Sequence, residues 1–277
     1  AVTFTNKAAG EMRERLEELL GDSKGLWVST FHATCVRILR QEIEILGFKR
    51  NFTIYDDQDQ ERLLKTLLQE LGIDDKALKP RAVAAAIDRA KNRGIWPDQL
   101  DDGDYQAEQI TRIYALYQER LKQANALDFG DLLMQVVRLF EDHPEVLEKY
   151  RQRFHYILVD EFQDTNQVQY RLVHLLASGH GNLCVVGDDD QSIYRWRGAE
   201  VGNILGFERD YPGCETIRLE QNYRSTKTIL DAADAVVANN TGRKIKKLWT
   251  ENDVGEGVTL ETLPDDLEEG RYLAGEI

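Results

Sequence analysis

Three clusters of polar side chains, each placed directly after a short apolar run, are the residues of this sequence best suited to chemistry. The first cluster follows the apolar run at 157–159 and begins with Asp160 and Glu161, with Asp164 close behind. An aspartate at the carboxyl end of a buried strand can bind the magnesium ion of a nucleotide, and a neighbouring glutamate can polarise a water molecule. Apolar runs that end in Asp-Glu also occur where no such site exists, so this cluster alone is compatible with a purely structural role.

The second cluster lies at 185–199, in the sequence VVGDDDQSIYRWRGA. Gln191 offers an amide after the expected end of a strand, a place from which it could contact a phosphate. Tyr194 and Trp196 alternate with Arg195 and Arg197, and aromatic rings interleaved with arginines are typical of surfaces that stack single-stranded bases and pair with phosphates. The alternative is a Tyr/Trp pair in the core with arginines on the surface beside it.

The third cluster lies at 219–226, in the sequence LEQNYRST. Arg224 follows the end of a predicted strand, where a guanidinium group could stabilise negative charge on a phosphoryl group in transfer. Tyr223 precedes it, and Ser225 is a suitable N-cap for the helix expected next. An arginine after a strand is also a common partner in surface salt bridges, and that alternative stays open.

The elements expected to position these clusters alternate between strands and helices, a pattern typical of α/β proteins with a parallel sheet. Short apolar runs predict strands at 1–5, 27–30, 155–161, 182–188 and 215–220. Because these runs are apolar throughout, we expect helices to cover both faces of the sheet that they form. From about residue 55 to 142 the pattern is helical, which predicts an all-helical insertion with Asp56 and Asp128 as N-caps and Pro80 in a first turn. The run at 257–263 predicts a strand of a further domain.

Composition and charge narrow the class of protein. The 277 residues carry a net charge of −14, which argues against binding nucleic acid over the whole surface but not against a local basic groove. There is no run of about 18 apolar residues and no signal-peptide pattern, so neither a membrane span nor secretion is expected. The three cysteines lack metal-ligand spacing and are expected to be thiols in a reducing cytoplasm. The sequence starts inside a predicted strand without Met, as expected for a fragment.

Several long motifs occur together and in a fixed order. DEFQDTN at 160–166, GDDDQSIYRWRGA at 187–199 and QNYRST at 221–226 resemble motifs II, III and IV of the UvrD/PcrA/Rep-type superfamily 1 DNA helicases. TFTNKAAGEMRER at 3–15 and STFHATCVRILR at 29–40 resemble motifs Ia and Ib, and the resemblance covers essentially the whole chain. It implies RecA-like domains of the P-loop NTPase type, divided as residues 1–53 and 143–226 (first domain), 54–142 (its helical insertion) and 227–277 (start of the second domain).

The same resemblance implies an activity and the residues for it. The parent protein would be an ATP-dependent helicase that uses ATP and Mg²⁺ to move 3′→5′ on single-stranded DNA. Asp160 would bind magnesium and Glu161 would activate the attacking water. Gln191 would contact the γ-phosphate, Arg224 would stabilise the transition state and Tyr223 would stack on adenine. The residues implied along the DNA path are Phe4, Thr5, Asn6, Thr30, His32, Tyr194, Trp196 and Arg197.

Two of these DNA-path residues have simpler alternatives, because His32 could be a solvated residue at a capped helix start and Phe4 could belong to the core. The partners implied for the parent protein are single-stranded DNA, single-strand/duplex junctions and accessory repair or replication proteins. Its implied location is the cytoplasm, in association with the nucleoid.

One part of the family pattern does not occur in these residues. The phosphate-binding sequence G-x-x-x-x-G-K-[ST], whose backbone amides and lysine cradle nucleotide phosphates, is not found among them. The 277 residues by themselves are therefore expected to lack efficient ATP turnover. The alternative function is a module that binds single-stranded DNA or a partner protein without hydrolysis. An RNA-directed enzyme is a weaker alternative, because nothing in the sequence is suited to contacting a 2′-hydroxyl.

Overall fold

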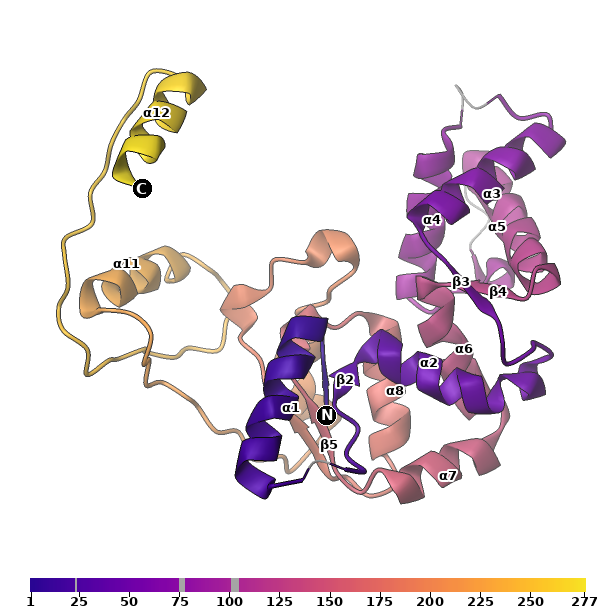
Figure 1. Cartoon of the computed structure of the whole chain (residues 1–277), viewed down its shortest axis with the longest axis horizontal. Coiled ribbons are helices and arrows are strands. Elements are labelled where there is room, and N and C mark those ends of the chain that lie inside the picture. The colour runs from indigo at the N-terminus through magenta and orange to yellow at the C-terminus, as the bar shows by residue number, and fades with distance from the viewer. Residues whose placement is uncertain (23, 75–77, 101–104) are drawn as a thin grey trace. The chain divides into compact units, whose positions relative to one another are not determined.

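The computed structural model describes residues 1–22, 24–74, 78–100 and 105–277, apart from the side chains of Tyr105 and Arg197. The chain divides into two compact units, Ala1–Asp210 and Tyr211–Ile277. Figure 1 shows the path of the chain, and each unit is described below by itself. Among the described residues, no helix is both long enough and apolar enough to cross a membrane.

A parallel sheet forms the centre of the first unit, as the alternating pattern predicts. Its strand order is β2 (Ser29–Thr30), β1 (Val2–Thr3), β5 (Ile157–Val159) and β6 (Leu183–Val185). All three pairings are parallel, so the carboxyl ends of these strands lie at one edge of the sheet. That edge is where parallel sheets of α/β proteins usually bind ligands.

Helices make up most of the rest of this unit. Their bounds are α1 (Asn6–Leu20), α2 (Phe31–Glu42), α3 (Asp57–Glu70), α4 (Pro80–Asn92), α5 (Tyr105–Gln123), α6 (Phe129–Asp142), α7 (Pro144–Arg153), α8 (Gln167–Ala177), α9 (Gly202–Leu205) and α10 (Phe207–Asp210). Two of the predicted N-caps and the predicted first-turn proline are confirmed. Asp56 and Asp128 each accept a hydrogen bond from the third residue of the helix that follows, and Pro80 is the first residue of α4.

The main core packs the sheet against α2, α6, α7 and α8. β5 points Ile157 and Val159 into this core, but Leu158 between them is 45% exposed. Leu158 stands in register with Cys184 of β6, which is also exposed. The expectation that both faces of these strands are covered is therefore wrong for the described residues, because helices bury only the face that carries Ile157 and Val159.

A second core lies inside the predicted insertion and is built by α3, α4 and α5, at the upper right of Figure 1. The insertion is not wholly helical, which corrects the sequence-based expectation. β3 (Thr53–Tyr55) and β4 (Ala126–Asp128) form a two-stranded parallel sheet. β4 is only three residues long, and its position is fixed by pairing with a segment more than seventy positions earlier, so no local pattern marks it. α6 falls within the predicted range of the insertion, yet its apolar residues belong to the main core.

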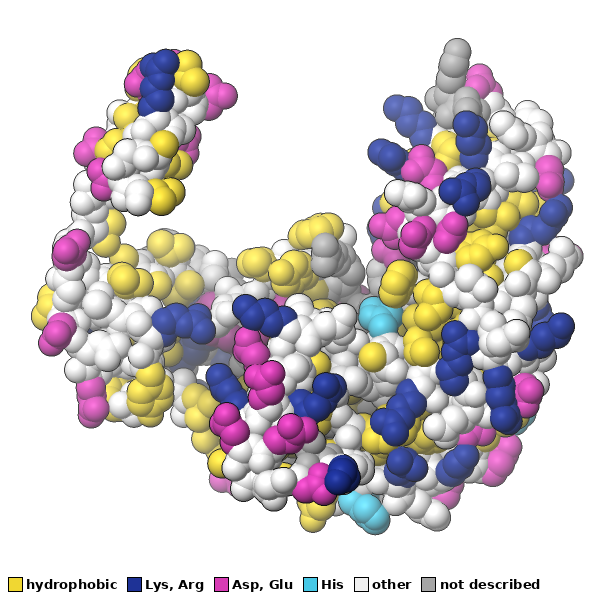
Figure 2. All heavy atoms as spheres, in the orientation of Figure 1, with side chains coloured by type: hydrophobic (Ala, Val, Ile, Leu, Met, Phe, Trp, Pro, Cys, Tyr) yellow, Lys and Arg dark blue, Asp and Glu magenta, His cyan; other side chains and the backbone are white. Residues whose placement is uncertain are grey.

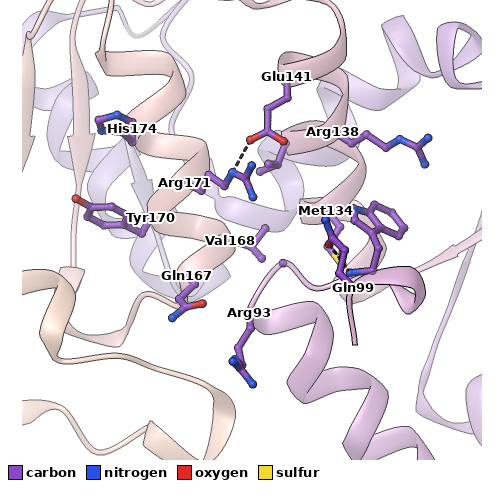
Figure 3. A pocket seen from close by; sticks show the side chains of 13 residues that line it. Arg93, Gln99, Met134, Arg138, Glu141, Gln167, Val168, Tyr170, Arg171 and His174 are labelled. Carbon is purple, nitrogen blue, oxygen red and sulfur yellow. Dashed lines mark hydrogen bonds and ion pairs between the residues drawn. The ribbon is translucent and has the colours of Figure 1, made fainter. Parts of the chain in front are cut away.

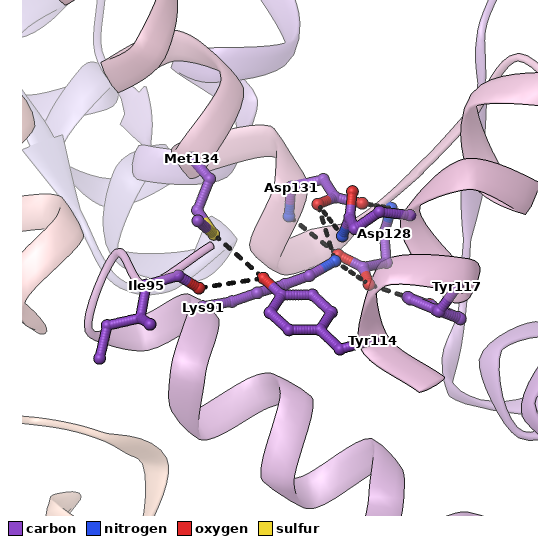
Figure 4. A network of polar contacts seen from close by, with 8 residues as sticks. Lys91, Ile95, Tyr114, Tyr117, Asp128, Asp131 and Met134 are labelled. Atoms are coloured by element: carbon purple, nitrogen blue, oxygen red, sulfur yellow. Dashed lines mark hydrogen bonds and ion pairs between the residues drawn. The ribbon is translucent and has the colours of Figure 1, made fainter. Parts of the chain in front are cut away.

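A buried ionic network joins α4 of the insertion to α6 (Figure 4). The Lys91 ammonium, 1% exposed, lies 2.6 Å from an Asp128 oxygen and 2.7 Å from an Asp131 oxygen. Tyr117 donates a hydrogen bond to Asp128, and Gln118 donates one to Asp131. Burial lowers the pKa of Lys91, but the two carboxylates outweigh burial and hold that pKa above its usual value. Burial, together with repulsion from Asp128, raises the pKa of Asp131 to about 6.

The second unit contains α11 (Lys227–Val237) and α12 (Asp266–Glu276). The strands predicted at 215–220 and 257–263 do not form, and the pairing seen there is one isolated bridge between Gln221 and Trp249. Ile217 and Leu219 are mostly exposed, because the described part of this unit gives these apolar runs no sheet to join. The N-cap of α11 is Thr226, one residue later than the predicted Ser225.

Candidate functional site: the carboxyl edge of the sheet

Asp160 and Glu161 lie where β5 leaves the sheet. The N–H of Asp160 donates to the Val2 carbonyl at 3.0 Å, and its carboxylate accepts a hydrogen bond from the Thr3 hydroxyl at 3.3 Å. Glu161 has a left-handed backbone, with φ 53° and ψ 42°, which non-glycine residues seldom adopt. Unfavourable backbone conformations of this kind persist where the surrounding structure enforces them, and they concentrate at functional sites.

A chain of hydrogen bonds joins Glu161 to Gln191 across the ends of β5 and β6. The Gln163 amide N–H₂ donates to the Glu161 carboxylate at 2.8 Å, and its carbonyl oxygen accepts from the Asp188 backbone N–H at 3.0 Å. The Asp188 carboxylate then accepts from the Gln191 amide at 2.9 Å. Gln163 is 1% exposed, so this amide is fixed between the two loops. The first two predicted clusters are therefore joined through specific side chains.

The loop after β5 and the loop after β6 are also closely packed at Gly187. A Cβ atom built on Gly187, two residues after β6, would lie 2.5 Å from the Gln163 side-chain oxygen and 3.1 Å from the Phe162 nitrogen. Phe162 also donates its backbone N–H to the Val186 carbonyl at 2.9 Å. A glycine is needed at position 187 because any side chain there would push the loop away from Gln163.

Carboxylates at this edge suit a hard divalent cation, which binds oxygen ligands. Asp160 lies at the edge with Glu161 beside it, and Glu161 is exposed. Asp164 is buried, and its Oδ1 has no hydrogen-bond partner among the described residues. Burial, followed by the Glu161 charge, raises the pKa of Asp164 above its ordinary value. The residues present therefore fit a magnesium site, while the loop that would hold nucleotide phosphates is not among these 277 residues.

The predicted DNA-path residues near the N-terminus follow β1 and β2, which are neighbouring strands. Phe4 packs edge-on against Phe31 with ring centroids 6.1 Å apart, and His32 does the same with Phe129 at 5.7 Å. Burial lowers the pKa of His32, which favours a neutral imidazole. Two threonines of the set, Thr5 and Thr30, use their hydroxyls as N-caps of α1 and α2, and Asn6 is the exposed first residue of α1. Figure 2 shows acidic and basic side chains interspersed over α1.

The aromatic pair of the second cluster lies on the surface. Trp196 is 74% exposed and Tyr194 is 38% exposed, with ring centroids 6.4 Å apart. The alternative of a Tyr/Trp pair in the core is therefore wrong. Arg197 ends the 3-10 turn Arg195–Arg197, and its side chain lies outside the described residues.

Tyr223 and Arg224 belong to the second unit and are described within it. Residues 223–225 form bends and are not part of a strand. Both side chains are exposed, and the Tyr223 hydroxyl donates to the Gln221 side chain at 2.8 Å. The Arg224 backbone N–H donates to the Asn222 side chain at 3.0 Å.

A pocket of about 340 Å³ lies elsewhere in the first unit, between the end of α4 and helices α6 and α8 (Figure 3). Arg93, Arg138 and His174 line it, and Arg171 pairs with Glu141 at its wall. None of the residues predicted to act on ATP lines this pocket, so the sheet edge remains the candidate site.

Sequence reasoning gave no role to Gln163 and Thr3, although both lie within the motifs quoted above. The signal for Gln163 was its place two residues after Glu161 in DEFQDTN, where the 3-10 turn Phe162–Asp164 directs it back toward the strand end. For Thr3 the sequence offered no such signal, because nothing in it predicted that β1 would lie beside β5. A contact between these strands brings its hydroxyl to Asp160.

Comparison with known proteins agrees with this arrangement of motifs. A family model described as the UvrD/REP helicase N-terminal domain matches residues 1–212, and a second, the UvrD-like helicase C-terminal domain, matches residues 217–277. Over 280 aligned residues the chain is 50% identical to the ATP-dependent DNA helicase PcrA of Bacillus subtilis (strain 168), and 51% identical to PcrA of Staphylococcus aureus (strain Mu50). All of this chain is covered, and it spans 38% of the length of each relative. With both helicase models matched in order and the two strand-end motifs joined at one sheet edge, the chain belongs to the UvrD/REP helicase family.

Proposed function

We propose that this chain is part of the motor of an ATP-dependent DNA helicase that moves 3′→5′ on single-stranded DNA. The observation that carries the proposal is the connection from Glu161 through Gln163 and Asp188 to Gln191. Such a connection lets a residue suited to polarising water respond to a residue suited to contacting phosphate. The relatives named ATP-dependent DNA helicase PcrA support the same activity.

In this proposal the residues predicted to act on ATP divide the chemical work. Asp160 supplies an oxygen ligand to the magnesium ion that accompanies ATP. Glu161 accepts a hydrogen bond from the attacking water and orients it. Gln191 contacts the γ-phosphate, Arg224 neutralises charge that develops on it, and Tyr223 stacks on the adenine. Magnesium, when bound, supplies positive charge that favours phosphoryl transfer.

We assign the DNA path to the surface that begins at the carboxyl ends of β1 and β2 and includes the exposed aromatic pair. Trp196 and Tyr194 offer rings on which bases stack, and Arg197 offers charge for phosphates. The remaining members of the path are Phe4, Thr5, Asn6, Thr30 and His32. The domain assignment that goes with this function is residues 1–53 and 143–226 for the first RecA-like domain, 54–142 for its insertion and 227–277 for the start of the second.

The proposal is tested with Glu161→Gln in the longer protein that contains these residues. Glutamine keeps the size and the hydrogen bond from Gln163 within reach but cannot act as a base, so turnover should fall by about a hundredfold to ten-thousandfold while ATP binding is kept. Steady-state ATP hydrolysis and equilibrium nucleotide binding measure the two quantities. Glu145→Gln, at an exposed glutamate of α7, is the matched control. Near-normal turnover of the Glu161 variant would remove Glu161 from the mechanism.

A further inference from the structure

The last turn of α4 in the insertion touches both motif loops through one side chain, Asn92. The Asn166 side-chain N–H₂ donates to the Asn92 side-chain oxygen at 2.8 Å. Asn166 ends the DEFQDTN motif and is the N-cap of α8, where its own oxygen accepts from the Gln169 N–H at 2.8 Å. Asn166 is 6% exposed, so its amide is held between the insertion and the start of α8.

The second motif meets Asn92 at its last glycine. Gly198 has φ +84°, and a Cβ atom there would lie 3.0 Å from the Asn92 Cβ and 3.1 Å from its side-chain nitrogen. Asn92 thus packs directly on the backbone that follows Tyr194 and Trp196. The orientation of the Asn92 side chain is fixed within α4, because its nitrogen donates a hydrogen bond to the Asp88 carboxylate one turn earlier at 3.1 Å.

The same two loops also meet beside Asn166. The Thr165 carbonyl accepts hydrogen bonds from the Glu200 N–H and from the Asn203 side chain, both at 3.0 Å. Thr165 is fully buried. The Thr165 carbonyl and the neighbouring Asn166 side chain are therefore where the first motif makes hydrogen bonds with the segment after the second motif and with the insertion.

We propose that Asn92 is a positioning residue that couples the helical insertion to the loops carrying Glu161 and Gln191, so that DNA held by this unit accelerates ATP hydrolysis. The inference rests on the proposed function. In this inference Asn92 does not act on Glu161 or Gln191 directly. It acts through its contacts with Asn166 and Gly198. A displacement of the end of α4 reaches both loops at once, because one side chain is hydrogen-bonded to one loop and packed on the other.

The test uses the longer protein and compares Asn92→Ala with wild type and with Ala85→Ser, a change on an exposed position of the same helix. The measurements are kcat for ATP with and without saturating oligo-dT, KM for ATP, Kd for oligo-dT and Tm. Small displacements of reacting groups reduce rates strongly, so the ratio of DNA-stimulated to basal kcat should fall about tenfold in Asn92→Ala. KM and Kd should stay close to wild type, while Tm should fall slightly because the buried Asn166 amide loses its hydrogen-bond partner. Every value for Ala85→Ser should stay close to wild type. An unchanged ratio, or KM and Kd that worsen together with Tm, would overturn the inference.

A pair of variants that exchanges the residue types at positions 88 and 92 distinguishes loss of coupling to DNA from general destabilisation of the contact between α4 and the two loops. Asn92→Asp keeps an oxygen that accepts from Asn166 but sets a second carboxylate against Asp88, one turn away. Asp88→Asn combined with Asn92→Asp restores a donor to that contact with its direction reversed. The double variant should regain most of the stimulation that Asn92→Asp loses, and equal loss in both variants would contradict the role of this contact. A wild-type protein without DNA stimulation would instead contradict the proposed function itself.

Discussion

The buried amide of Gln163 joins the loop after β5 to the loop after β6. Gln163→Ala removes its hydrogen bonds to Glu161 and to the Asp188 N–H. A buried donor or acceptor left without a partner costs about 1–3 kcal/mol, so the free energy of unfolding should fall by that amount. Chemical denaturation measures it. Gln152→Ala, on the surface of α7, is the control and should change stability little; equal stability of both variants would mean that water replaces the lost partners.

Trp196 is an exposed ring that we propose stacks on bases. A ring that is 74% exposed beside a second aromatic ring contributes little to the core, so Trp196→Ala should leave Tm nearly unchanged. Loss of one stacking ring should weaken single-stranded DNA binding in the longer protein by about 1–3 kcal/mol. Fluorescence anisotropy with labelled oligo-dT measures this, with Tyr156→Ala, at another exposed aromatic residue, as control. Unchanged affinity would place the DNA path elsewhere.

Individual residues of the site were predictable to different degrees. Asp160, Glu161 and Gln191 follow apolar runs, and parallel strands bring such residues to one edge. Gln163 was not predictable in this way, because its role depends on the left-handed backbone at Glu161 and on the loop after β6. Residue types alone do not show which way the Gln163 side chain points within its turn. The roles of Asp160, Glu161 and Gln191 stay predictions, as do those of Arg224 and Tyr223.

At the scale of elements, α4 and α6 are joined by an ion network rather than by apolar contacts alone. Lys91→Met would leave the Asp128 and Asp131 carboxylates buried without their cation. Removing one partner from a buried ionic group typically destabilises a protein by about 3–5 kcal/mol. We expect a loss of that size in guanidinium unfolding, and almost none for Lys65→Met on the exposed face of α3. A loss below 1 kcal/mol would mean that the carboxylates take up protons easily, as the raised pKa of Asp131 favours.

Helices were predicted better than strands, and the reason is physical. Caps such as Asp56 and Asp128 act on neighbouring residues, so their signal is local and the structure confirms both. Strands need partners that are distant in sequence. The run at 155–161 pairs with β1 and β6, whereas the run at 215–220 joins no sheet among the described residues. The sequence analysis missed β4 because this strand has only three residues. Its pairing with β3 stabilises it without a recognisable alternation of apolar and polar residues.

At the scale of the whole chain, most of the hydrolytic machinery proposed here is gathered on the first unit, but the phosphate-binding sequence is not among the 277 residues. Carboxylates and an amide alone do not hold a triphosphate, because the phosphates need backbone amides and a lysine. The 277-residue chain should therefore show no ATP hydrolysis stimulated by single-stranded DNA, in a phosphate-release assay run beside the longer protein. Turnover comparable to that of the longer protein would mean that another segment binds the phosphates.

The pairing of β3 with β4 has a consequence for how such a chain can change over evolutionary time. The Thr53 N–H donates to the Asn125 carbonyl at 3.0 Å, so the points where the chain leaves the main core and returns to it are neighbours. If residues 53–125 were absent, a short connection would join the two ends that remain. An inserted domain can therefore be gained, lost or exchanged at this position in a single genetic event. The order of the strands in the sheet that carries Asp160 and Glu161 would not change.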